Sequence, residues 1–187
     1  MRNRQELSKE SSLQDKETQS PSSDAIVAPV YFPVSPLKLI VMSTCTLGIY
    51  ELYWQYKNWS LIKEREKLDI RPFWRAWFAI LFCYSLFKKI RTTAQSLNLK
   101  RSIAIGPLAA GWIIVSLFWR LPDPYWLLSY FAMLFLLPVQ SLVNEMNESV
   151  EPGYEQNKRF TPWNIVAIVF GGIFFVLILL GGLFLAE

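Results

Sequence analysis

Three long runs of uncharged, apolar residues constrain this chain more than any other feature of its sequence. They cover residues 103–119, 125–143 and 165–186 and are 17, 19 and 22 residues long. A helix needs roughly 17–25 such residues to cross the ~30 Å hydrocarbon core of a bilayer. The chain is also only 18% charged, against roughly 25% in soluble domains. The sequence therefore predicts an all-α, polytopic protein of the cell membrane, with three transmembrane helices in these runs.

Two shorter apolar segments precede them, at residues 37–54 and 74–88. Each holds 12 uncharged residues between its flanking charges, and 12 residues of helix rise only about 18 Å. We therefore expect both to be embedded without crossing. Small and hydroxyl residues around Thr46 and Gly48 predict a turn in the first segment. The second contains no Gly or Pro, so we expect it to lie tilted in the interface. The alternative is five transmembrane helices.

The distribution of Lys and Arg favours three spans over five. Cytoplasmic loops carry an excess of these residues. If the two short segments do not cross, 18 of the 19 Lys and Arg residues lie on one side; if they cross, the division is 12 against 7. Both topologies place the N-terminus in the cytoplasm and the C-terminus outside.

A polar tail and a basic connector complete the predicted organisation. Residues 1–36 are interpreted as a disordered polar cytoplasmic tail, because most of this segment is rich in Ser, Gln, Lys and Glu and such segments bury too little apolar surface to fold. Residues 37–187 form the predicted membrane domain. Its connector, 55–73, mixes Trp59 with Lys and Arg, which predicts an amphipathic helix on an anionic cytoplasmic leaflet.

A motif lies at the end of the first short segment, in the stretch TLGIYELYW. Its matching residues are Thr46, Gly48, Ile49, Tyr50, Tyr53 and Trp54, with Glu51 inside it and Trp59 just beyond. Residues 36–90 resemble an uncharacterised family of bacterial integral membrane proteins, a domain of unknown function with this signature. The resemblance implies a bacterial inner-membrane location and no reaction. From the residues alone, the aromatic side chains are expected to anchor at the headgroup level and pack around Gly48.

Carboxylates are the remaining candidate functional residues. An ionised carboxylate at a membrane boundary needs a partner or water, so Glu51 is expected either to reach water at the headgroup level or to pair with Arg75 or Lys88. A second candidate is an acidic stripe after the fourth segment, comprising Asn144, Glu145, Glu148 and Glu151. Such carboxylates bind cations or act as acid and base in some sites, but a solvated helix face is expected here. It would pair with the two basic connectors, namely 55–73 and the segment after the second short run, which carries Lys88, Lys89, Arg91, Lys100 and Arg101.

The residue inventory limits the function classes. The chain has no His, which excludes Ser-His-Asp chemistry and most zinc centres. It also lacks the glycine-rich nucleotide motifs, and we expect no cofactor, no metal and no nucleic-acid partner. We expect a non-enzymatic protein: a scaffold, an accessory subunit or a lipid-surface organiser, with a membrane protein or a second copy as possible partner. A small oligomeric transporter or channel component is the alternative, and a membrane enzyme that uses carboxylates is third.

Overall fold

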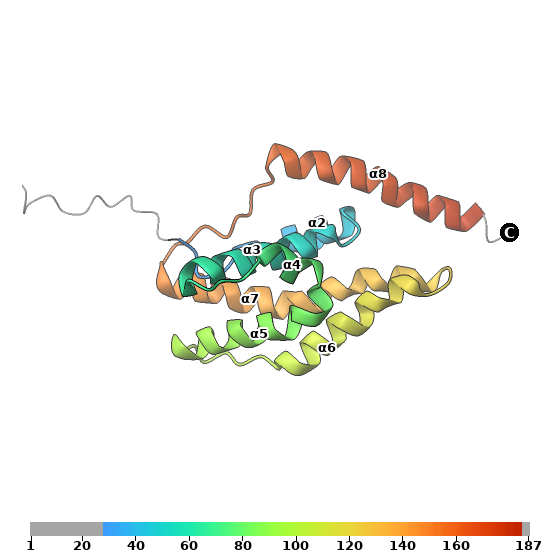
Figure 1. The fold of residues 1–187 in the computed structure, drawn as a ribbon. Helices are drawn as coiled ribbons and strands as arrows, with labels where there is room; N and C mark the ends of the chain where they lie inside the picture. Colours follow the sequence, from blue (N-terminus) through green and yellow to red (C-terminus); the bar gives the residue numbers. More distant parts are fainter. Residues whose placement is uncertain (1–27, 185–187) are drawn as a thin grey trace, which may run out of the picture.

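The computed structural model describes residues 28–184, and every regular element in this range is helical (Figure 1). The predicted all-α class is confirmed, with no strand among the described residues. The elements are α2 (Pro36–Cys45), α3 (Ile49–Glu66), α4 (Pro72–Trp77), α5 (Ala79–Ser96), α6 (Ile105–Ser116), η1 (Leu117–Arg120), η2 (Tyr125–Ala132), α7 (Met133–Val150) and α8 (Pro162–Phe184). The predicted tail falls mostly on residues 1–27, which lie outside the described range.

The first short segment folds as a helical hairpin, as its composition predicted. Ser35 caps α2 by accepting a hydrogen bond from the Lys38 backbone N–H at 3.2 Å, and Pro36 occupies the first helical position, both common at helix starts. The chain then reverses at Leu47 and Gly48, whose φ values are 54° and 84°. Glycine adopts this left-handed conformation without strain. α2 and α3 consequently run back along each other.

The second short segment also doubles back, which the sequence did not predict. α4 and α5 are separated by a single residue, Phe78, with φ −92° and ψ 44°. Arg75, before this break, lies over the Trp59 ring at 4.4 Å, and Phe82, after it, meets the same ring at 6.5 Å. Both arms therefore pack against α3. The expectation that this segment contains no turn is wrong, because the chain bends at Phe78 and both arms pack on Trp59 although no Gly or Pro marks a turn.

The remaining helices form a long antiparallel pair and a peripheral arm (Figure 1). The pair is α6–η1 and η2–α7, joined by residues 121–124. Gly111 of α6 lies so close to the Phe135 ring of α7 that a Cβ would collide with it. α8 packs against α2, where Gly171 faces the backbone carbonyl of Cys45. Glycine thus permits both close approaches.

One described helical run, Tyr125–Val150, is 26 residues long and apolar enough to cross a membrane. The apolar stretches Pro36–Cys45, Ile105–Arg120 and Pro162–Ile178 are each shorter than 18 residues. The structure thus supports one potential span by length and composition.

The boundary of the predicted tail needs a correction. Residues 28–36 were included in it, yet Tyr31 and Val34 are completely buried and Phe32 is 9% exposed. The apolar run Val30–Val34 belongs to the core, where it lies between α3, α5 and α7. Its position depends on hydrogen bonds with Asn144 and Asn147 of α7, which lie more than 100 residues away in the sequence.

The two neighbouring glycines of α8 give a matched stability test. We expect Gly171→Ala to lower the thermal midpoint in detergent by about 4 °C or more, because its Cβ would collide with the Cys45 carbonyl and displace one helix. Gly172→Ala is the control, since a Cβ there meets nothing within 4 Å. Equal midpoints for the two variants would show that α8 does not pack on α2 in this way.

Candidate functional site

Amide side chains of α3 and α7 hold the N-terminal segment 30–34 by its backbone. Asn147 accepts hydrogen bonds from the backbone N–H groups of Val30 and Tyr31, at 2.9 and 3.3 Å, and donates to the Tyr31 carbonyl at 2.9 Å. Asn144 donates to the Val34 carbonyl at 3.0 Å. The buried backbone of a non-helical segment must find such partners, and here the side chains supply them.

The same amides also bond to one another and to α3. Gln140 donates to Asn144 at 2.8 Å and to the Phe32 carbonyl at 3.3 Å, and it accepts from the Trp54 indole. Asn58 of α3 accepts from the Phe32 N–H at 3.0 Å. Gln140, Asn144, Asn147 and Asn58 are all less than 8% exposed. We call these four residues the amide clasp.

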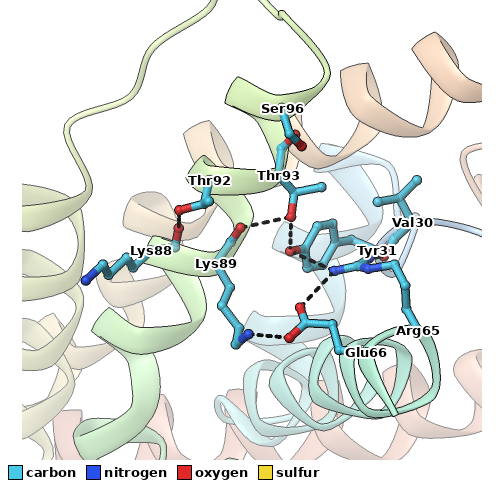
Figure 2. A network of polar contacts seen from close by, with 9 residues as sticks. All are labelled: Val30, Tyr31, Arg65, Glu66, Lys88, Lys89, Thr92, Thr93 and Ser96. Atoms are coloured by element: carbon cyan, nitrogen blue, oxygen red, sulfur yellow. Dashed lines mark hydrogen bonds and ion pairs between the residues drawn. The ribbon is translucent and has the colours of Figure 1, made fainter. Parts of the chain in front are cut away.

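A closed ring of polar contacts joins the segment to the ends of α3 and α5 (Figure 2). Arg65 donates to the Tyr31 hydroxyl at 3.2 Å, and that hydroxyl shares a 2.9 Å hydrogen bond with Thr93. Thr93 donates to the Lys89 carbonyl at 3.0 Å, and Glu66 closes the ring by pairing with Lys89 at 2.5 Å and with Arg65 at 3.6 Å. The base of the first hairpin and the base of the second therefore meet at one end of the bundle.

The motif residues have identifiable structural roles. The Thr46 hydroxyl donates to the Met42 carbonyl at 2.7 Å and accepts from the Tyr50 N–H at 3.0 Å, which closes one helix and starts the next. Gly48 provides the left-handed turn. Tyr50 is buried beside Tyr53, with ring centroids 5.7 Å apart, whereas Ile49 is 67% exposed. The T-x-G-I-Y pattern thus builds the hairpin tip.

The predicted headgroup anchoring is wrong for the two tryptophans. Trp54 and Trp59 are completely buried. Trp54 is held by Gln140 of the amide clasp, and Trp59 is the platform on which Arg75 stacks. Tyr53 is the exposed member of the set at 43%.

Glu51 lies at the wall of a cavity of about 540 Å³ between the two hairpin tips and the α6–α7 pair. The residue is only 6% exposed, and its Oε2 accepts a hydrogen bond from the Trp112 indole at 2.6 Å. The turn residues Gly48 and Ile49 and the break residues Trp77 and Phe78 also line the cavity. We call it the Glu51 cavity.

The predicted partners of Glu51 lie elsewhere. Arg75 stacks on Trp59 and on Phe82, at 4.4 and 5.3 Å, and Lys88 is exposed on α5. None of the ion pairs formed by residues 28–184 involves Glu51. The pairing prediction is therefore wrong. Trp112, which is 61 residues away in the sequence, supplies the partner that charge-based reasoning missed.

The acidic stripe divides between the interior and the surface. Asn144 is buried in the amide clasp, while Glu145 pairs with Arg101 at 3.8 Å and Glu148 accepts from the Gly153 N–H at 2.9 Å. Glu151 is half-buried. The buried face continues through Asn147 rather than Glu148, because positions 140, 144 and 147 share one side of a helix. Residues 28–184 contain no group of three or more potential metal-binding His, Cys, Asp or Glu side chains.

Comparison with protein-family models, curated proteins and solved structures finds no match to this chain. The resemblance of residues 36–90 to a membrane family of unknown function therefore stays a prediction.

The amide clasp predicts a local unfolding phenotype. We expect Asn147→Ala to expose segment 30–34 and to lower the thermal midpoint by about 10 °C, since it leaves three buried backbone groups unpaired, each worth roughly 1–3 kcal/mol. Chymotrypsin should then cut after Tyr31, which is completely buried in the intact protein. Gln95→Ala, at an exposed helical amide, is the control. Unchanged protection of Tyr31 in Asn147→Ala would contradict the role of the clasp.

Proposed function

We propose that this chain is an integral membrane protein with three crossing helices, α6–η1, η2–α7 and α8, and two hairpins that enter from the cytoplasmic side and return. Its exposed apolar surface supports insertion. Phe170, Ile173 and Leu177 of α8 are 57–73% exposed, and Trp163 is 82% exposed. Continuous apolar surface of this extent marks a site that binds a protein partner or a membrane, and a lipid bilayer would cover all of it.

The Glu66–Lys89 ion pair is the observation that favours three crossings over five. In a five-helix topology the connector 55–73 lies outside and Lys89 lies inside, so the ~30 Å hydrocarbon core would separate the two residues. Their charged atoms are 2.5 Å apart. Arg65 of the same connector likewise donates to the Tyr31 hydroxyl of the N-terminal segment at 3.2 Å. Both contacts agree with re-entrant hairpins.

The charge distribution supplies the orientation. The end of the bundle that holds the bases of the hairpins also carries Lys38, Arg65, Lys89 and Arg101. Arg120 lies at the opposite end, beside the 121–124 loop. By the positive-inside rule, the first end is cytoplasmic. The N-terminus then lies in the cytoplasm and the C-terminus outside.

The role that this arrangement supports best is that of a non-enzymatic organiser of the anionic cytoplasmic lipid surface, acting as a scaffold or an accessory subunit. The amide clasp is used for structure, because its side chains bind the backbone of segment 30–34 rather than facing a site. The basic connector carries Lys63, Lys67 and Arg71 as exposed cations on a rigid base. Each such cation near an anionic leaflet contributes roughly 1 kcal/mol.

A second candidate is a small transport component, and the Glu51 cavity favours it. Ionisable groups within membrane segments commonly mark substrate or ion pathways. Glu51 stands at the meeting point of two hairpin tips, where discontinuous helices could accommodate a ligand. The first candidate acts through the basic connector on anionic lipid, whereas the second acts through the Glu51 cavity on a ligand.

Lipid selectivity tests the first candidate. In nanodiscs of mixed phosphatidylglycerol and phosphatidylcholine, native mass spectrometry should show preferential retention of phosphatidylglycerol. The triple variant Lys63→Gln, Lys67→Gln, Arg71→Gln should reduce this preference by about fivefold for each charge removed. Arg120→Gln, at the opposite end of the bundle, is the control and should keep it. Identical preferences in all three proteins would reject the role of the basic connector.

A further inference from the structure

The Glu51 carboxylate has an incomplete set of partners. Glu51 is 6% exposed. The Trp112 indole donates the one hydrogen bond that the carboxylate accepts from a described residue, at Oε2. No described cation pairs with it, although buried charges in proteins are usually paired. The two partners predicted from the sequence lie elsewhere, because Arg75 stacks on Trp59 and Lys88 is exposed on α5. A positive charge supplied from outside the chain would complete the site.

The Glu51 cavity has the shape and the lining for such a charge. Its volume of about 540 Å³ falls within the roughly 300–1,000 Å³ typical of small-molecule sites. Four aromatic residues line it: Trp77, Phe78, Trp112 and Trp119. Aromatic faces attract organic cations, by about 2 kcal/mol or more when the site is desolvated. The carboxylate and the aromatic walls therefore select the same ligand class.

The exposed lining residues indicate how a ligand would enter. Trp77, Ile49 and Leu81 line the cavity and are 62%, 67% and 73% exposed. In the proposed topology these side chains face hydrocarbon at the depth of the hairpin tips. A ligand would then arrive laterally from the bilayer, with its apolar part remaining among these residues and its charge reaching Glu51.

We propose that the Glu51 cavity binds the positively charged head of a lipophilic ammonium compound. The inference rests on the proposed membrane location. The chemistry is the same for a lipid with an amine headgroup and for a non-lipid cationic amphiphile. An anionic head would be repelled by the carboxylate, and a neutral one would leave it unpaired.

The test uses the full chain in phosphatidylglycerol nanodiscs, with dodecyltrimethylammonium as the probe and tryptophan fluorescence as the signal. Glu51→Gln should weaken binding by about tenfold or more, since it removes the charge and keeps an oxygen that accepts from Trp112. Glu64→Gln is the matched control, because it makes the same change of charge at an exposed position of α3 and should bind like the natural protein. Neutral dodecyl maltoside should not distinguish the three proteins.

A second variant keeps the inference testable if Glu51→Gln folds poorly. Trp77 is exposed, so Trp77→Leu leaves the core intact and should weaken the probe by about threefold through loss of a cation–π contact. Competition by added phosphatidylethanolamine would identify a lipid amine as the occupant, and its absence would identify a non-lipid cation. Equal probe affinity in the natural protein and in Trp77→Leu, or in well-folded Glu51→Gln, would overturn the inference. Because binding is compared among inserted proteins, that result would leave the proposed topology and lipid preference standing.

Discussion

The fold depends on buried amide side chains that hydrogen-bond the backbone of a non-helical segment. Helices satisfy their own backbone groups, but residues 30–34 have no regular partner and lie inside the bundle. Asn147, Asn144, Gln140 and Asn58 provide the missing donors and acceptors. Each unmade bond would leave a buried polar group at a cost of roughly 1–3 kcal/mol. The position of this segment fixes the relation between α3 and α7, since both contribute to the clasp.

The clasp also sets where the two hairpins begin and end. Tyr31 extends from the clasped segment into the ring formed with Arg65, Glu66, Lys89 and Thr93. Because this ring joins the ends of α3 and α5, the opposite ends of the hairpins lie together near the middle of the α6–α7 pair. The Glu51 cavity is the space between those tips. Thus a structural network at the bases of the hairpins places their tips at the candidate ligand site.

The sequence predicted those features that depend on local chemistry. The positions of α6, α7 and α8 follow from the length of their apolar runs, and the tip of the first hairpin follows from Thr46 and Gly48. The break at Phe78 could not be predicted in this way, because it results from two residues packing on Trp59 of another helix.

The missed parts of the candidate site are also non-local. The charges near the membrane boundary suggested Arg75 or Lys88 as a partner of Glu51, whereas its actual partner is the neutral indole of Trp112. Asn147 lies 116 residues from Tyr31 in the sequence. One available signal was the recurrence of amides at Gln140, Asn144 and Asn147, which marks a single helix face. The apolar run Val30–Val34 within an otherwise polar tail was another.

The central claim is that both basic connectors lie at the same, cytoplasmic end of the bundle. The most direct measurement replaces Cys45 and Cys83 by Ala and places single cysteines at the exposed positions Glu64, Thr92 and Asp123. A membrane-impermeant thiol reagent added to intact cells should label only the cysteine at 123, and all three should react after the membrane is opened. Labelling at 64 but not at 92 in intact cells would contradict the claim, because it would place a bilayer between the two connectors.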